Sequence, residues 1–230
     1  MARLRLKAVR KRNKGLLKSP KKRQAGIMHI EFLVEEPSAE VALKNIVPKI
    51  LREDVSFAIH PHQGKPDLLG KLPLRLRGYR AWLPKDWRIV ILIDADHEDC
   101  LEIKGQLERS ARDAGLITKS KAASASRFQV LNRLAIEELE AWFFGDIEAL
   151  HAAYPRISLN LRNKAKYRNP DEILGGTWEA LERELQKVGY YSAGLSKISA
   201  ARDISISMVP ERNQSKSFQV FRQGLLELGC

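Results

Sequence analysis

Short apolar runs alternate with amphipathic stretches along the chain from Met28 onward. Two runs have the length and the lack of breakers that are typical of strands, Ile30–Val34 and Arg88–Ile93. The second is apolar and rich in β-branched residues after its arginine, which indicates a strand buried on both faces of a parallel sheet. Val55–Ile59 and Phe128–Leu131 are the remaining strand candidates.

Helical periodicity fills the intervals between these runs. Apolar residues recur at helical spacing from Val41 to Leu51, with Ser38 expected as the N-cap and Pro48 expected to kink the helix. The same pattern predicts helices at Asp67–Trp82, Glu98–Ala114, Ile136–Phe144, Trp178–Val188, Leu195–Arg202 and Phe218–Leu228. Strands that alternate with helices predict an α/β fold: a parallel, Rossmann-like sheet with flanking helices and a mostly helical C-terminal part. We therefore expect an α/β core over residues 28–144 and a helical extension over 145–230 that packs on it.

The first 27 residues are expected to form a separate basic arm. Between Met1 and Gln24 the chain carries eleven Lys or Arg residues and no acid, so the remainder of the chain is near neutral although the whole chain has a net charge of +12. Such an arm is typical of a disordered segment or of one that contacts nucleic acid phosphates. A start assigned too far upstream, with Met28 as the natural first residue, is a third interpretation. The overall basic charge is therefore weak evidence for a nucleic-acid partner.

Composition excludes several classes of protein. Over 230 residues, 44% are hydrophobic, which is enough for a real core, but no apolar run reaches the roughly 20 residues that span a bilayer. Cys100 and Cys230 form neither a disulfide framework nor a C-x-x-C metal site. We expect a cytoplasmic protein with reduced thiols and no membrane partner.

Acidic residues directly follow the two strongest strands. Glu35 comes after the first, and Asp94 and Asp96 come after the second. Ligands of open α/β sheets bind at the carboxyl ends of the strands, so these carboxylates converge if the two strands are parallel neighbours. A cation removes their mutual repulsion, and oxygen donors without His or Cys select Mg²⁺ or Mn²⁺. A D-x-D alone is also typical of a polar turn after a buried strand; the second strand-terminal acid favours a metal site.

These acids lie in segments that resemble the motifs of Toprim domains. FLVEEPSAE is similar to the first motif, a strand that ends in Glu, and ILIDADHED is similar to the second, a strand that ends in Asp-x-Asp. From about Met28 to its end the chain resembles an uncharacterised Toprim-like family, domain of unknown function 4276, and more distantly the overcoming-lysogenisation-defect nucleases. Further matching segments are His60–Lys65, Leu68-Leu69 with Arg77–Tyr79, Leu131–Arg133, Glu137–Trp142, Tyr191 with Lys197, and Ser215–Phe218. One position departs from the Toprim pattern, because Glu36 stands where that motif usually has glycine.

The resemblance implies a role for each matching residue. Glu35 is expected to be a metal ligand and a general acid or base, and Asp94 and Asp96 the metal-binding pair. Glu140 would serve a second metal ion, and Lys197 would neutralise charge in the transition state. Glu36 and Glu138 are further candidate acids, and Lys65, Lys71 and Arg77 are candidate phosphate-binding residues.

Plainer interpretations stay open for several of these residues. Glu138 and Glu140, and likewise Lys71, Arg77 and Arg80, fit the solvated faces of helices, and Lys197 fits an ordinary surface lysine. His60 and His62 fit metal ligands less well than hydrogen-bonded residues at a strand end. Ser215 and Ser217 fit a turn and helix cap.

The resemblance implies a nuclease that depends on Mg²⁺ or Mn²⁺ and cleaves DNA or RNA. It also permits an ATP-binding-cassette-type ATPase as partner in phage defence, and a homodimer. One alternative is a non-catalytic Toprim module that binds nucleic acid or an ATPase. Another is a haloacid-dehalogenase-type phosphatase. Such enzymes usually carry the D-x-D pair on the first strand, followed by Thr or Val; here the pair is on a later strand, and the residue two after Asp96 is Glu98.

Overall fold

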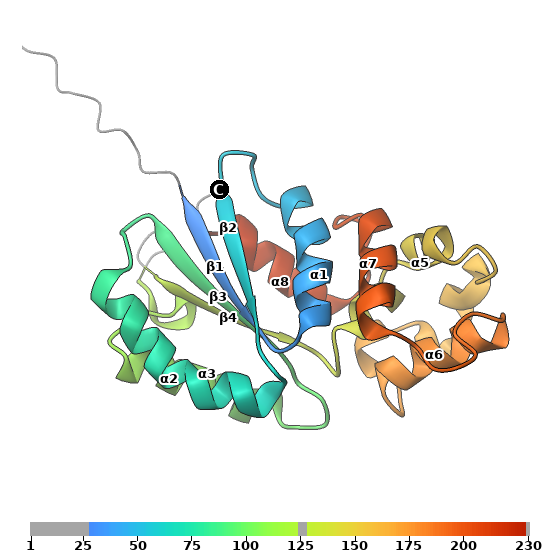
Figure 1. Cartoon of the computed structure of the whole chain (residues 1–230), viewed down its shortest axis with the longest axis horizontal. Coiled ribbons are helices and arrows are strands. Elements are labelled where there is room, and N and C mark those ends of the chain that lie inside the picture. Colours follow the sequence, from blue (N-terminus) through green and yellow to red (C-terminus); the bar gives the residue numbers. More distant parts are fainter. Residues whose placement is uncertain (1–27, 124–127, 229–230) are drawn as a thin grey trace, which may run out of the picture.

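The computed structural model describes residues 28–123 and 128–228, so the expected arm and Cys230 lie outside the described residues. Four parallel strands form one sheet in the order β2-β1-β3-β4 (Figure 1). The strands are β1 (His29–Val34), β2 (Ser56–Pro61), β3 (Trp87–Asp94) and β4 (Val130–Ala135). This architecture confirms the predicted Rossmann-like α/β class.

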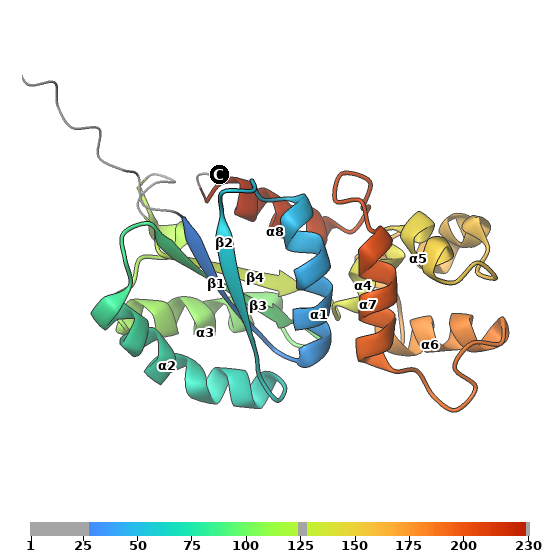
Figure 2. The same ribbon diagram turned by 45° about the horizontal axis from the view of Figure 1, so that its top comes forward.

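The connections between strands reverse direction at the middle of the sheet. The chain runs from β1 through α1 (Pro37–Ile46) to β2 on one side, and then through α2 (Lys65–Trp82) to β3 on the other side of β1. Helix α3 (Cys100–Asp113) then leads to β4. Helix α1 covers one face of the sheet, and α2 and α3 cover the other (Figures 1 and 2). The gap between the carboxyl ends of β1 and β3 is therefore the switch point at which open α/β sheets bind ligands.

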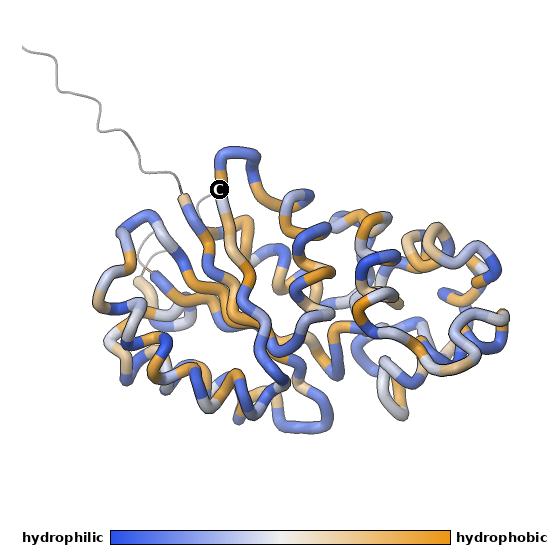
Figure 3. Tube along the Cα trace, in the orientation of Figure 1, coloured by the Kyte–Doolittle hydropathy of each residue, from blue (hydrophilic) through white to orange (hydrophobic). Residues whose placement is uncertain are grey.

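Strand β3 is buried on both faces, as its apolar run predicts. Ile89, Ile91 and Ile93 belong to the core that the sheet forms with α2 and α3, while Val90 and Leu92 belong to the core on the opposite face. Figure 3 shows hydrophobic positions concentrated along the central strands and polar positions in the loops.

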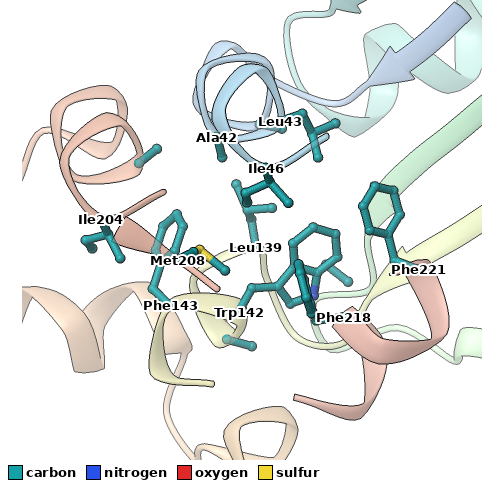
Figure 4. Close-up of a cluster of buried hydrophobic side chains, with 14 of the residues drawn as sticks. Ala42, Leu43, Ile46, Leu139, Trp142, Phe143, Ile204, Met208, Phe218 and Phe221 are labelled. Carbon is teal, nitrogen blue, oxygen red and sulfur yellow. The ribbon is translucent and has the colours of Figure 1, made fainter. Parts of the chain in front are cut away.

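Within the described residues, five α-helices follow β4: α4 (Glu140–Phe144), α5 (Ile147–Ala153), α6 (Thr177–Lys187), α7 (Lys197–Ser207) and α8 (Lys216–Leu226). One buried cluster runs from the α1 face of the sheet into these helices (Figure 4). At its centre the Trp142 ring lies 5.1 Å from that of Phe218 and 5.0 Å from that of Phe221. Its indole N–H donates to Ser217 Oγ at 2.9 Å, so no polar atom of this large side chain is stranded in the core. Within the described residues, no helix is long and apolar enough to cross a bilayer.

Several predicted boundaries are wrong for identifiable reasons. Ser38 is not the N-cap of α1: Glu36 is, because Pro37 occupies the first helical position, where its missing N–H costs nothing. Pro48 does not kink that helix but sits in a 3₁₀ turn after it, Val47–Lys49. Strand β4 starts later than expected and extends to Ala135, through polar residues that break the apolar pattern because β4 is an edge strand. Ser215 does cap α8, accepting the N–H of Phe218.

Candidate functional site

The predicted acids meet at the switch point between β1 and β3. Glu35 Oε2 accepts the backbone N–H of Asp94 at 3.1 Å, which joins the ends of the two strands. Asp94 is buried, and burial followed by the charges of Glu140 and Glu35 raises the pKa of its carboxyl well above the usual range. Burial also raises the pKa of Glu35, against the opposing effect of its hydrogen bond from Asp94. Strong perturbation by burial and like charges at a strand end is typical of functional sites.

Asp96 is held beside this cluster by a strained turn and a lysine. Its backbone is in the left-handed region (φ 50°), as is that of Glu137 (φ 59°), and the Asp96 N–H donates to Glu137 O at 2.6 Å. Non-glycine residues in this region cost free energy and concentrate at functional sites. Lys65, at the start of α2, lies 2.6 Å from Asp96 Oδ2 and 2.7 Å from Glu98 Oε1. Lys65 is buried, so its ammonium group is fixed against these carboxylates.

Glu140 contributes a further carboxylate from the start of α4. The residue is only 1% exposed, and its Oε2 accepts no hydrogen bond from any described residue. Burial raises the pKa of Glu140 to about 7, although the charge of Lys197 opposes the shift. The solvated-face interpretation is therefore wrong for Glu140, and its charge is the largest electrostatic influence on Asp94.

Lys197, at the start of α7, faces the same acids. Its Nζ lies 3.7 Å from Glu36 Oε1, 3.8 Å from Glu138 Oε1 and 5.1 Å from the centre of the Trp178 ring. Burial lowers the pKa of Lys197, but the charges of Glu140, Glu36 and Glu138 outweigh burial and leave the pKa above its ordinary value. It is thus a charged, half-buried lysine of the acidic cluster rather than an ordinary surface residue.

Glu138 and Glu36 belong to the same cluster through Lys197, and the backbone of neither residue is in the left-handed region. Glu138 Oε2 accepts the Thr177 hydroxyl at 3.0 Å and the Trp178 N–H at 2.8 Å, which ties the start of α6 to the site. Glu36 has an extended backbone (φ −146°), a conformation open to any residue, so this turn does not require the glycine of the Toprim pattern.

The other predicted residues are dispersed. Lys71 pairs with Asp67 at 2.7 Å on the exposed face of α2, and Arg77 is exposed further along the same helix. His60 bonds to the Glu31 carboxylate, and His62 Nδ1 bonds to a backbone carbonyl at 2.9 Å, in agreement with their interpretation as hydrogen-bonded residues.

Sequence reasoning missed the roles of Trp178 and of the Gly175-Gly176 pair. The two glycines line a hollow of about 300 Å³ beside Asp96, together with His97, Glu137, Glu138 and Glu179. Both glycines have positive φ and Gly176 is the N-cap of α6, so a glycine pair ahead of an amphipathic helix was the available signal.

The donor set suits a hard cation. Glu35, Asp94, Asp96 and Glu140 offer carboxylate oxygens only, and one oxygen of Glu140 is buried with no hydrogen-bond partner in the part of the chain that the structure describes. Among the described residues no three His, Cys, Asp or Glu side chains stand in ready-made coordinating geometry. Mg²⁺ needs less than that, because it binds through one or two carboxylates, with water and substrate phosphate as its remaining ligands.

Comparison with known proteins gives a family and no activity. No curated protein and no solved structure matches the chain. A family model described as a domain of unknown function, DUF4276, matches residues 34–226, which include the acids of the site as well as Lys65 and Lys197. The chain therefore belongs to the DUF4276 family.

Proposed function

We propose that this chain is a Mg²⁺- or Mn²⁺-dependent nuclease of the Toprim type, which hydrolyses phosphodiester bonds in DNA or RNA. The observation that carries the proposal is the cluster of the half-buried Glu35 with the buried Asp94 and Glu140, in which burial and like charge raise all three pKa values. Such a cluster is costly in an empty site, and a divalent cation offsets that cost.

Each residue has a distinct task in this proposal. Glu35, Asp94 and Asp96 would hold one cation, and Glu140 would serve a second. Such a cation, when bound, stabilises negative charge on the phosphoryl oxygens and lowers the pKa of water. Lys65 fixes the Asp96 carboxylate through its 2.6 Å ion pair. Lys197 keeps its positive charge beside the acids, where it offsets the charge that develops on the phosphate. The alternative role of Glu35, in place of a ligand, is that of general acid or base, because burial raises its pKa toward the neutral range.

A second candidate is a non-catalytic module that binds nucleic acid or an ATP-binding-cassette-type ATPase. The observation in its favour is that Lys65 and Lys197 already offset part of the acidic charge without any metal. An ATPase partner, a homodimer and a role in phage defence are extensions of the nuclease proposal and require its activity first.

The test is cleavage of supercoiled plasmid, single-stranded DNA and total tRNA by the purified chain, with Mg²⁺, Mn²⁺ or EDTA. We expect cleavage that requires the metal and that the Asp94→Asn/Asp96→Asn double variant lacks. The matched control is Asp54→Asn/Asp113→Asn, which removes two acids that are 64% and 69% exposed in ion pairs away from the site, and it should cleave normally. Equal cleavage by the first double variant would refute the assignment, and metal-independent binding that survives in it would favour the non-catalytic module.

A further inference from the structure

A second hollow, of about 560 Å³, lies in the helical C-terminal part, outside the acidic site. It is bounded by the end of α4, the start of α5, the segment from Arg162 to Pro170 and the start of α8. Its charged lining residues are four cations and one acid, namely Arg162, Arg168, Arg212, Lys216 and Glu148. Asn163, Asn169 and Gln214 add amide groups. This lining favours an anionic ligand.

Two of the four cations are already neutralised and two are not. Arg212 makes a two-point ion pair with the buried Asp146 carboxylate, at 2.7 and 2.9 Å, and Arg162 lies 2.8 Å from Glu148. Arg168 and Lys216 are exposed and form no ion pair with any described residue. The uncompensated positive charge of the hollow therefore comes from Arg168 and Lys216. The ion pair with Asp146 fixes Arg212, another residue of the same lining.

The basic hollow leads toward the acidic site. A neighbouring hollow of about 420 Å³ shares Asn169 and Lys216 with it and extends past Lys104 to Ile136. The residue after Ile136 is Glu137, which lines the hollow that contains Asp96. We call the two hollows that share Asn169 and Lys216 the basic trough; its end at Ile136 is one residue along the chain from Glu137, which lines the acidic hollow of Asp96.

The lining of the 560 Å³ hollow fits a phosphate backbone rather than bases. Tyr167 is 2% exposed and stacks on Phe144 at 4.8 Å, so neither ring offers a face on which a base can stack. Asp171 lines the neighbouring hollow of about 420 Å³ and is buried. Its oxygens accept the Ser215 and Ser217 hydroxyls and the Ser217 N–H. Glu172 is the one acid of this hollow that is exposed among the described residues. Contacts to phosphate carry no sequence information, so recognition here is independent of sequence.

We infer that the basic trough binds the sugar-phosphate backbone of the nucleic acid and leads it to the acidic site, with Arg168 and Lys216 contacting phosphates. This inference rests on the proposed nuclease function and adds the substrate's path to it. Its signature is binding that depends strongly on salt and weakly on sequence.

The experiment measures binding in the Asp94→Asn/Asp96→Asn background, so that no strand is cut. Arg168→Ala/Lys216→Ala is compared with Arg80→Ala/Lys85→Ala, which removes two exposed cations near the amino end of β3. The probes are labelled duplexes of about 20 base pairs and RNA strands of similar length, each in two unrelated sequences, followed by anisotropy in Mg²⁺ between about 50 and 200 mM salt. Adenosine monophosphate serves as a single-phosphate competitor.

The loss of two phosphate contacts should weaken binding about 10- to 30-fold near 150 mM salt and reduce the salt slope by about two. The control pair should have a much smaller effect, and sequence should have little. Equal effects of the two pairs, no binding by the parent protein, or competition by the mononucleotide at concentrations equal to those of the duplex would overturn the trough. Cleavage by the unmodified chain with binding unchanged in Arg168→Ala/Lys216→Ala would remove the trough and leave the nuclease standing. Pair-dependent binding without cleavage would do the reverse.

Discussion

Replacing Glu140 by glutamine should stabilise the metal-free protein above neutral pH, although the substitution removes a residue of the proposed active site. The Glu140 carboxyl is 1% exposed, one of its oxygens has no partner among the described residues, and its pKa rises to about 7. A raised pKa means that the folded state holds the proton more tightly than the unfolded state does. Ionisation of Glu140 above that pKa therefore destabilises the fold.

The size of the effect follows from the shift. The difference between about 7 and the ordinary value of 4.5 corresponds to at most about 3 kcal/mol above pH 7. This penalty develops as pH rises through the unfolded pKa and is complete once pH exceeds the folded one, so it is absent at pH 4. For a chain of this length, Glu140→Gln should raise Tm at pH 8 by up to roughly 6–12 °C in EDTA.

Glu184→Gln is the matched control, because Glu184 is also a buried glutamate, 4% exposed, but in an opposite electrostatic environment. Burial raises the pKa of Glu184, but hydrogen bonds from Lys187, Tyr167 and Lys166 outweigh it and lower the pKa to about 2. A lowered pKa contributes stability that is present above pH 4.5 and lost as pH falls toward 2. The same substitution should therefore destabilise the protein at pH 8 by an amount of similar size.

The assay is urea unfolding of the three proteins at pH 8 and pH 5, in EDTA and in Mg²⁺. An ion that binds only the folded state stabilises it. Mg²⁺ should therefore stabilise the unsubstituted protein more than Glu140→Gln, because the substitution removes a carboxylate that would bind the ion. If Glu140→Gln lowered stability at pH 8 in EDTA, burial of an uncompensated charge would be the wrong description of the cluster. If Mg²⁺ stabilised both proteins equally, Glu140 would not belong to the cation site.

Two further predictions concern packing around the basic trough, and both are read from unfolding free energies. Asp146→Ala should cost about 2 kcal/mol or more, because the buried carboxylate accepts the N–H groups of Ala149 and Val209 besides pairing with the 37% exposed Arg212. Asp54→Ala, at an ion pair that is 64–65% exposed, should cost less than about 1 kcal/mol. Gly145→Ala should destabilise the protein strongly, since the new Cβ would lie 2.0 Å from Asn213 Oδ1 and 2.9 Å from the backbone nitrogen of Ser215. Gly70→Ala, in a helix with nothing within 4 Å, should be neutral or stabilise by up to about 1 kcal/mol. Equal costs within either pair would contradict the packing described.

The sheet and half of the site follow from local patterns in the sequence. The apolar run of β3 specifies a strand buried on both faces, and parallel neighbours bring Glu35 and Asp94 to the same edge. That β1 and β3 are neighbours is not local information, because strand order depends on which helix covers which face. The N-cap of α1 was misread although Pro37 was a usable signal.

The rest of the site depends on tertiary packing that no local pattern records. The segment around Glu140 looks like an amphipathic helix in sequence, with Glu140 on its solvated face, yet the packing of α4 buries this residue. In sequence Lys65 is a candidate phosphate-binding residue and Lys197 also fits a surface lysine, and only the fold places them against Asp96 and Glu138. Trp178 carries no motif, and its place beside Lys197 depends on the packing of two helices.

The ribosome adds the residues of the site to the growing chain at widely separated times. Lys197 follows Glu36 by about 160 residues, and at ~5–20 residues per second this separation amounts to roughly 8–32 s of synthesis. During that interval the acids of β1 and β3 exist without the lysine that offsets them. A chain interrupted before α7 therefore contains the acids and Lys65 but lacks the charge of Lys197, so synthesis of the C-terminal part completes the site.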